Sequence, residues 1–549
     1  MQDTYDVVVL GSGAAGCTAA LTAAAEGASV ALLEKGDGFG GTTAMSGAVV
    51  WVPANPIAAR HGISDTPEDA LAYLDSLSHG LIDPVLAETL ISTGPEMLEY
   101  LQTRTPLRMR LVERFPDYHP EHPGGMPGGG RSLEPELFCF QDLGAWGDRI
   151  APEATIRRLR LCEQAQGGGT GTIPAQELRE REQADIRSCG MALIGALLRG
   201  CLDNGVEAET GVRGEELVVS DGRVTGVEVE IGDQRLIVHA RSGVVLATGG
   251  FEWDPELVRS FLRGPMTGPA STPTNTGDGL RMAMRVGASL GNMREAWWMP
   301  VCQIPGDTYL GHPRSVLTLR ERTVPGSIMV NRRGLRFTNE ASNYNAQGAA
   351  LHAFDVPSFD YANIPAWIIF DERCFRAYGF STLAPTDEPP EWISRGETLA
   401  ALANAIEVPA DALTKTVSRF NFNVQQTGRD PDFGRGDSAY DSWNGDQTQP
   451  GHAATLGALD QPPYYAVRVH PGTLGTKGGP RTDADGRVLD VDGAVIDGLY
   501  AVGNAMAGVT GMVYGGAGGT LGPAMTFGFR AGRHAAHLSS RAAVGTGPR

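Results

Sequence analysis

Cysteine is scarce in this sequence, and long hydrophobic runs are missing from it. The chain has seven cysteines among 549 residues, an odd number without any Cys-x-x-Cys pair. This usage argues against a disulfide framework and predicts reduced thiols in a cytoplasmic protein. No apolar run reaches the roughly 18 residues that a membrane-spanning helix needs. The first residues also lack the basic start and apolar core of a signal peptide.

Basic residues are outnumbered, and almost all of them are arginine. The chain carries 45 Lys and Arg against 64 Asp and Glu, which gives a formal net charge of −19, and lysine occurs only three times. A nucleic-acid-binding surface needs a basic face, so this balance argues against a nucleic-acid partner. His122, His352 and His470 show no metal-ligand spacing, and we assign no metal site.

Glycine, by contrast, is abundant, with 73 residues that gather where predicted strands end. Residues 5–10 and 29–34 are short apolar runs that predict buried parallel strands, and an Ala-rich helix is expected between them. Residues 244–246 predict a further buried strand, and residues 176–204 predict a helix. Strands that alternate with helices in this way predict an α/β fold of the Rossmann type.

The pattern changes in the second half of the chain. From about residue 286 to 454, short strands, aromatic residues and Pro-rich loops alternate, with helices expected at 397–405 and 409–425. The glycine-rich strand-and-turn pattern then returns. We therefore expect a discontinuous nucleotide-binding domain, residues 1–285 and 455–549, with an inserted α+β catalytic domain at 286–454.

The first predicted turn has the spacing of a dinucleotide-binding loop. In the run 11–16, Gly11 permits a sharp turn, Gly13 lets the backbone approach a pyrophosphate, and Gly16 lets the following helix pack on the sheet. The pyrophosphate is expected at the N-terminus of that helix, where free N–H groups and the helix dipole favour an anion. Glu34 ends the second predicted strand, 18 residues after Gly16. Its position predicts hydrogen bonds to a ribose.

Beyond this loop, the sequence resembles the flavoproteins of the fumarate reductase and 3-ketosteroid dehydrogenase group. The resemblance lies in residues 40–47, 247–250, 276–279 and 500–504, so it covers both ends and the middle of the chain. It implies FAD as the cofactor of a Rossmann-type FAD-binding domain. The succinate dehydrogenase branch attaches its flavin through a His, and no His occurs between residues 1 and 60, so we expect non-covalent FAD.

The loop motif and the resemblance together predict the cofactor-binding residues. These are Gly11, Gly13, Ala14, Ala15, Gly16, Glu34, Lys35, Gly41, Thr42, Thr43, Ser46, Gly47, Ala247, Thr248, Gly249, Asp278, Gly503, Asn504, Gly519 and Leu521.

Two further stretches separate the branches of this group by substrate. Fumarate reductases bind a dicarboxylate through His and Arg, in an H-T-M-G-G run and an H-G-A-N-R-L-G-G run, because guanidinium groups suit carboxylates. The corresponding stretches here, residues 475–479 and 510–519, lack those His and Arg residues. Lys477 in the first stretch departs from the pattern expected of a 3-ketosteroid dehydrogenase. A doubly charged substrate would find poor partners at these positions.

The second stretch instead resembles the 3-ketosteroid Δ1-dehydrogenase pattern, Tyr-x-Gly-x-Gly-Gly. In that family a tyrosine hydroxyl and a glycine N–H polarise the ketone oxygen, and the matching residues are Tyr514 and Gly518. Tyr344 follows Glu340 of a G-x-R-F-x-N-E core by four residues and matches the family's proton-abstracting tyrosine. Tyr118 matches a tyrosine that supports this base.

The resemblance therefore implies flavin-dependent dehydrogenation of a cyclic ketone to an α,β-unsaturated ketone, with 3-ketosteroid 1(2)-dehydrogenation as the leading reaction. Tyr514 and Gly518 would bind the ketone oxygen, Tyr344 would remove the α-hydrogen with the support of Tyr118, and the β-hydrogen would pass as hydride to flavin N5. A free tyrosine has a pKa of about 10, so alkaline pH should favour turnover.

Other functions fit parts of the same pattern. A Δ4-(5α)-ketosteroid dehydrogenase or a cyclohexanone-type dehydrogenase would use much the same tyrosines. A fumarate reductase-like dicarboxylate enzyme and a flavin-binding protein without catalysis are the less favoured alternatives. The expected partners are an apolar, steroid-like ketone and an unidentified electron acceptor, without nucleic acid and without stable membrane insertion.

Overall fold

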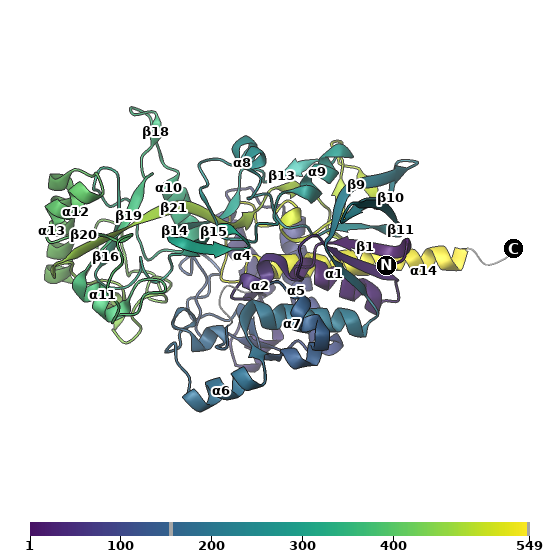
Figure 1. Cartoon of the computed structure of the whole chain (residues 1–549), viewed down its shortest axis with the longest axis horizontal. Coiled ribbons are helices and arrows are strands. Elements are labelled where there is room, and N and C mark those ends of the chain that lie inside the picture. Colours follow the sequence, from purple (N-terminus) through teal and green to yellow (C-terminus); the bar gives the residue numbers. More distant parts are fainter. Residues whose placement is uncertain (153–156, 546–549) are drawn as a thin grey trace.

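The structure is a computed structural model that describes residues 1–152 and 157–545. Figure 1 shows two lobes along the long axis of the molecule. One lobe carries both termini and combines purple and yellow segments, so the two ends of the chain build it together. The other lobe is green and is formed by the middle of the chain.

The lobe that holds the N-terminus is built on a mixed sheet whose central strands are parallel. The expected strand–helix–strand order is confirmed as β1 (Thr4–Leu10), α1 (Ala14–Ala25) and β2 (Val30–Glu34). Strand β1 is central, because it pairs in parallel with β2 on one side and with β11 (Gln234–Leu246) on the other. Strand β24 (Val495–Ala501) extends the sheet beyond β11, also in parallel. Covered strands of this kind read as continuous apolar runs.

Helices from distant parts of the chain cover this sheet. Helix α1 packs against α14 (Leu521–Gly545) and against α7 (Cys189–Asp203). The single helix expected at 176–204 is wrong: α6 (Ala175–Gln183) and α7 are separate helices with strand β7 between them. Asp185 has a φ of +46°, a left-handed conformation that interrupts the helix.

The second lobe contains a largely antiparallel sheet with the strand order β15-β14-β21-β19-β16. The strands are β15 (His312–Leu317), β14 (Ala296–Tyr309), β21 (Tyr464–Thr476), β19 (Ala366–Asp371) and β16 (Ser327–Asn331). Helices α12 (Leu399–Ala405) and α13 (Ala410–Thr427) form where helices are expected. Their apolar side chains join those of β16 and β19 in one hydrophobic cluster. Together the two lobes confirm the mixed α/β class.

Strand β21 connects the two lobes. Its first half pairs with β19 and its second half pairs with β14, and in Figure 1 it runs from the green lobe to the centre of the molecule. Strand β21 and the short strand β12 (Gly268–Pro269), which pairs with it, both lie outside residues 286–454. The boundaries 1–285, 286–454 and 455–549 stay a prediction.

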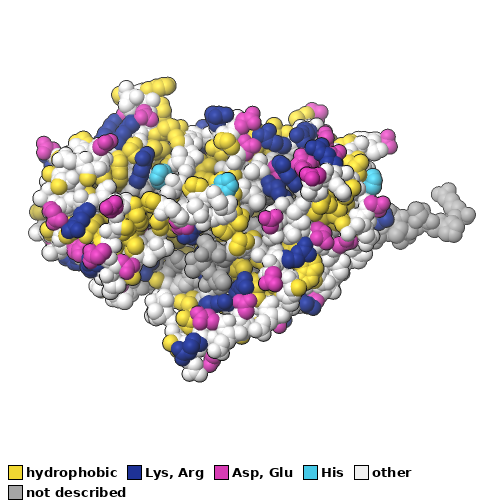
Figure 2. Space-filling view, in the orientation of Figure 1, with side chains coloured by type: hydrophobic (Ala, Val, Ile, Leu, Met, Phe, Trp, Pro, Cys, Tyr) yellow, Lys and Arg dark blue, Asp and Glu magenta, His cyan; other side chains and the backbone are white. Residues whose placement is uncertain are grey.

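The surface carries charges of both signs. Figure 2 shows basic and acidic side chains interspersed over the visible face. Within residues 1–152 and 157–545, we find no helix with the length and apolarity that crossing a membrane requires.

Candidate active site

A cavity of about 730 Å³ joins the glycine loop of the first lobe to side chains of the second. All residues predicted to bind cofactor or substrate line this cavity, except Gly16 and Gly519. A Cβ atom on Gly16 would lie 1.9 Å from the Gly11 carbonyl oxygen, and one on Gly519 would lie 3.0 Å from the Tyr514 ring. These two glycines therefore permit close packing behind the cavity wall.

The nucleotide end of the cavity is shaped by backbone. Gly11 has a φ of +100°, and a Cβ atom there would lie 2.4 Å from the Ala247 carbonyl oxygen, so only glycine fits. Helix α1 begins at Ala14 without a side-chain cap and without an acidic residue in its first turn. The Ala14 N–H already donates to the Thr43 hydroxyl at 3.1 Å. The other N–H groups of this first turn and the helix dipole fit the pyrophosphate of a dinucleotide.

Glu34 is held in place at the end of β2. Its carboxylate accepts hydrogen bonds from the Ser12 hydroxyl (2.6 Å), the Ser12 N–H (3.0 Å) and the Gly36 N–H (2.8 Å). The Ser12 hydroxyl in turn accepts from the Gly40 N–H at 2.9 Å. Ser12, which no sequence motif singled out, connects the glycine loop to Glu34 through these hydrogen bonds and lines the same cavity. The fixed carboxylate fits the ribose contact predicted for Glu34.

Lys35 and Asp278 form an ion pair beside Glu34. The Lys35 ammonium lies 2.8 Å from the Asp278 carboxylate, and Arg213 lies 3.2 Å from the same carboxylate. Burial raises the pKa of Asp278, but Lys35 and Arg213 outweigh burial and hold the pKa below its ordinary value. Both predicted residues line the cavity as a charged pair.

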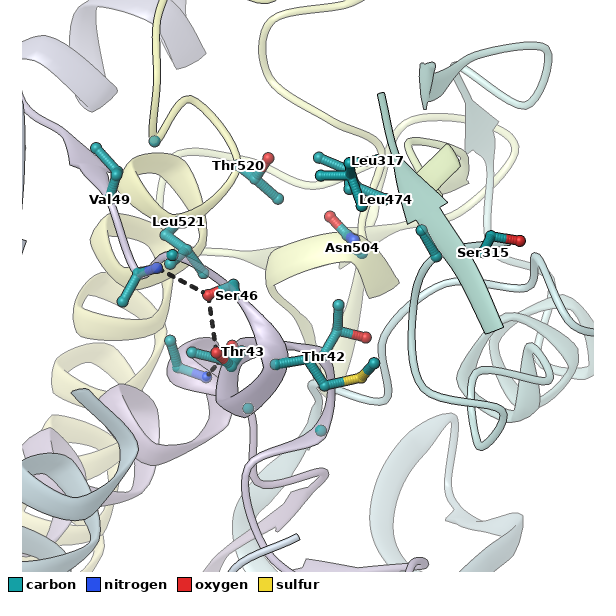
Figure 3. A pocket seen from close by; sticks show the side chains of 18 of the residues that line it. Thr42, Thr43, Ser46, Val49, Ser315, Leu317, Leu474, Asn504, Thr520 and Leu521 are labelled. Atoms are coloured by element: carbon teal, nitrogen blue, oxygen red, sulfur yellow. Dashed lines mark hydrogen bonds between the residues drawn. The ribbon is translucent and has the colours of Figure 1, made fainter. Parts of the chain in front are cut away.

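The middle of the cavity brings together segments that are far apart in the sequence. Figure 3 shows Thr42, on helix α2 (Gly41–Met45), on one side of Asn504 and Leu317 and Leu474 on the other. Thr43 of the same helix is turned toward α1, where its hydroxyl is bonded. The Asn504 side-chain oxygen accepts a hydrogen bond from the Trp297 indole at 3.0 Å. The sequence analysis also missed Asn275, which donates to the Thr42 hydroxyl at 3.1 Å and lines the cavity. Hydrogen bonds between residues that are distant in the sequence give no local sequence motif from which they could be predicted.

At the other end of the cavity the predicted tyrosines meet. The Tyr118 hydroxyl donates to the Tyr344 oxygen at 2.8 Å. The rings of Tyr344 and Tyr514 lie 5.3 Å apart, and those of Tyr118 and Tyr514 lie 5.0 Å apart. Tyr440, which the sequence did not point to, packs edge-on against Tyr118 at 5.0 Å. None of these four side chains is more than 8% exposed.

Local structure positions the Tyr118–Tyr344 pair. Tyr344 is the first residue of α10 (Tyr344–Leu351), and the Asn343 side chain caps that helix by accepting from the Ala346 N–H at 3.0 Å. The Asn343 amide also donates to the Tyr118 carbonyl at 3.3 Å. Asn343 therefore joins the helix of one tyrosine to the loop of the other. The guanidinium of Arg322, which is fully buried, donates to the Ser342 carbonyl at 2.8 Å.

The loop that carries Tyr118 is anchored by a buried ion pair. The Asp117 carboxylate accepts from the Trp51 indole at 2.9 Å and from the Arg131 guanidinium at 2.8 Å. Burial raises the pKa of Asp117 to about 6, although Arg131 and Trp51 act against it. The Tyr118 N–H donates to the Gly515 carbonyl at 2.9 Å, which brings this loop against the turn that follows Tyr514.

That turn offers two neutral donors. The Tyr514 hydroxyl lies 2.9 Å from the Thr520 hydroxyl, which lines the same cavity. Gly518 has a φ of +92°, and a Cβ atom there would lie 2.5 Å from the backbone nitrogen of Trp51, so the conformation needs glycine. No hydrogen bond within the described residues uses the Gly518 N–H. This N–H and the Tyr514 hydroxyl are therefore available to one carbonyl oxygen.

Burial controls the protonation of the tyrosines. It raises the pKa of Tyr344 well above the usual value, and the neighbouring Tyr514 raises it further. The hydrogen bond from Tyr118 has the opposite effect and lowers the pKa of Tyr344. Burial also raises the pKa values of Tyr118 and Tyr514. The arrangement is that of a phenol whose anion is stabilised by one adjacent donor.

Comparison with known proteins gives matches along the whole chain. A family model described as an FAD binding domain matches residues 6–521. The chain is 43% identical over 540 residues to a 4-oxocyclohexanecarboxylate 2-dehydrogenase of Sinomonas cyclohexanicum, covering 97% of this chain and 93% of that protein. It is 40% identical over 573 residues to a 3-oxosteroid 1-dehydrogenase of Mycobacterium tuberculosis, covering 98% and 99%.

A solved structure is similar throughout. The crystal structure of a 3-ketosteroid Δ1-dehydrogenase from Sterolibacterium denitrificans, in complex with 1,4-androstadiene-3,17-dione, superposes with a TM-score of 0.91 at 35% sequence identity. The match covers 98% of this chain and 100% of that one.

Proposed function

This chain belongs to the FAD binding domain family, and from that premise we propose that it dehydrogenates a cyclic ketone to the α,β-unsaturated ketone. The proposed substrate class is the 3-oxosteroids, with the bond between carbons 1 and 2 as the reacting bond. The FAD cofactor and the kinship with the 3-oxosteroid 1-dehydrogenases, both expected from the sequence, are confirmed by the family match and by the relatives at 35–43% identity.

One observation supports this reaction above all. The cavity that fits the dinucleotide also holds two neutral donors, the Tyr514 hydroxyl and the Gly518 N–H, beside the hydrogen-bonded pair Tyr118–Tyr344. An uncharged carbonyl oxygen needs only such neutral donors. A dicarboxylate would need cations, which bind carboxylates more strongly.

The proposed mechanism follows from these positions. The ketone oxygen accepts hydrogen bonds from Tyr514 and Gly518, which stabilise the negative charge that develops on it and so acidify the α-hydrogen. Tyr344 acts as its phenolate, which the hydrogen bond from the Tyr118 hydroxyl stabilises, and it takes that hydrogen as a proton to become the neutral phenol, leaving the charge on the enolate oxygen. FAD held along the glycine loop at Gly11 and by Glu34 would supply the acceptor for the hydride that leaves the β-carbon.

Anaerobic titration of the FAD-loaded protein tests the proposal. A 3-oxosteroid such as 4-androstene-3,17-dione should bleach the flavin absorbance and yield the 1,4-diene, whereas succinate should leave the spectrum unchanged. Failure of every cyclic ketone to bleach the flavin would contradict the proposal. Bleaching by succinate alone would instead point to a dicarboxylate enzyme.

A small cyclic keto acid is the second candidate substrate. The relative from Sinomonas cyclohexanicum, 43% identical, is named for 4-oxocyclohexanecarboxylate. Arg157 lines the cavity and donates to the Ser46 carbonyl at 3.1 Å, so a guanidinium is present that suits a carboxylate. If 4-oxocyclohexanecarboxylate bleached the flavin and 4-androstene-3,17-dione did not, the reaction would stand and the substrate class would change.

Non-covalent FAD and a cytoplasmic location belong to the same proposal. No histidine among the described residues lines the cavity, which supports non-covalent attachment, and the seven cysteines are free thiols, which supports a reducing compartment. Acid precipitation should release all of the flavin into the supernatant. Flavin that stays in the protein pellet would contradict non-covalent binding.

A further inference from the structure

Lys477 is a buried cation that the proposed reaction does not use. Its side chain is 1% exposed, directly after β21, and it stands where the sequence departs from the family pattern. Within the described residues, no carboxylate lies within ion-pair distance of its ammonium group. The ammonium instead donates to the Gly511 carbonyl at 3.0 Å and to the Val513 carbonyl at 2.7 Å. Both carbonyls belong to the turn that leads into Tyr514.

An aromatic ring covers the remaining side of the ammonium. The nitrogen lies 3.8 Å from the centre of the Trp297 ring, which favours the charged amine through a cation–π contact. Trp297 packs edge-on against Tyr514 at 4.7 Å, and the Lys477 nitrogen lies 6.0 Å from the Tyr514 ring. The ammonium group has three N–H donors, and two carbonyls and one indole face account for them.

We propose that Lys477 is a positioning residue for Tyr514, whose phenol it fixes at the ketone-binding site by anchoring residues 511–513 against Trp297. This inference rests on the role proposed for Tyr514 in binding the ketone oxygen. Other contacts also hold this turn: the Asn345 amide donates to the Met512 carbonyl at 3.2 Å, and the Thr510 hydroxyl donates to the Val513 carbonyl at 3.0 Å. Lys477 differs from them because its one ammonium group binds the carbonyls on both sides of Met512. Lys477 connects the turn to the end of β21 and thereby to the second lobe.

Burial of Lys477 disfavours the charged form of its amine. Burial lowers the pKa of Lys477 to about 7, although the nearby Glu295 raises it, and Arg263 lowers it further. Glu295 is committed elsewhere, because its carboxylate lies 3.1 Å from Arg263. Burying a charged lysine without a carboxylate partner lowers the stability of the folded protein. Its place beside the turn of Tyr514 gives it a role that an apolar residue could not fill.

Replacement of the charge tests the proposal. Lys477→Met keeps the apolar stem and removes the donors, and Lys415→Met makes the same change at an exposed lysine of α13 as a matched control. We expect K477M to keep its FAD and to reduce the flavin about 10-fold more slowly with little change in KM, because a displaced phenol weakens transition-state binding. K415M should behave like the wild type.

A double-mutant cycle shows whether the lysine acts through Tyr514. In the Tyr514→Phe background, the Lys477→Met change should alter the flavin-reduction rate less than about 2-fold, because the group that it positions is already gone. An equal loss in both backgrounds would overturn the proposal, as would full activity of K477M.

A second variant guards against misfolding. Lys477→Gln keeps two N–H donors on a shorter, uncharged side chain, so it should lose less activity than K477M. If neither variant retains FAD, the lysine serves the fold as a whole and the proposal is overturned. If the wild type itself is not bleached by any cyclic ketone, the proposed function has failed. If the wild type is bleached and K477M is bleached equally fast, only this inference has failed.

Discussion

At the nucleotide end of the cavity the glycine loop and the start of α1 present backbone to a ligand, whereas at the carbonyl end three tyrosines present side chains. The start of α1 offers N–H groups from one continuous stretch, which the turn at Gly11 brings to the cavity. Tyr118, Tyr344 and Tyr514 come from three segments that are far apart in the sequence. A binding site formed by the backbone is sensitive to substitutions that move the main chain. A binding site formed by phenol side chains is sensitive to the removal of a single hydroxyl group.

The largest effect is expected at the nucleotide end. Gly16→Ala would place a Cβ atom 1.9 Å from the Gly11 carbonyl oxygen, so the glycine loop must move and FAD should be lost from the purified protein. The absorbance ratio of flavin to protein measures this. Gly128→Ala, where a Cβ atom meets nothing within 4 Å, is the control. Normal FAD content in G16A would show that the loop is more pliable than the structure indicates.

Loss of a single oxygen at the carbonyl end should stop the chemistry and leave the cofactor in place. Tyr344→Phe and Tyr514→Phe should each lower turnover by about 10²-fold or more, because one removes the base and the other removes a donor to the ketone oxygen. Flavin content should not change. Tyr464→Phe, outside the cavity lining, is the matched control. Near-wild-type turnover in Y344F would remove that residue from the mechanism.

Substitution of Tyr118 is expected to have a smaller effect on turnover, and this effect should depend on pH. Its hydrogen bond lowers the pKa of Tyr344, so Tyr118→Phe should raise that pKa and shift the acid limb of the turnover profile upward by about one pH unit. Turnover should rise with pH in both proteins because the base acts as its anion. The pH dependence of kcat/KM measures the shift. An unchanged limb would mean that Tyr118 does not act on the base.

The smallest effect is expected at the outer edge of the tyrosine cluster. Tyr440 contacts Tyr118 through its ring and accepts from the Asn444 amide at 3.4 Å, without a hydrogen bond to Tyr344. Tyr440→Phe keeps the ring and should lower turnover by only about 3-fold. Steady-state kinetics with one ketone compare it with Y118F. A loss as large as that of Y344F would extend the catalytic set to Tyr440.

The same contrast explains how much the sequence could predict. The glycine loop, the acid at the end of β2 and the strand order around them follow from local patterns, and the structure places them together. Ser12 and Asn275 escaped prediction because their contribution is a hydrogen bond to a distant segment. No spacing rule reports such a bond.

At the carbonyl end, prediction depended on the family resemblance. A lone tyrosine is ordinarily a packing residue, so Tyr118, Tyr344 and Tyr514 could be singled out only by the motifs around them. Tyr440 has no such motif and became visible only through its contact with Tyr118. Lys477 stood out in the sequence as a departure, but its contacts with the turn before Tyr514 required the structure.

A crystal structure of the FAD-loaded protein with a bound 3-oxo enone, such as 1,4-androstadiene-3,17-dione, tests the central claim most directly. We expect the ketone oxygen to lie at hydrogen-bond distance, about 3 Å, from both the Tyr514 hydroxyl and the Gly518 nitrogen, with Tyr344 beside the α-carbon. A ketone oxygen bound instead by a guanidinium or ammonium group, away from these two donors, would contradict it.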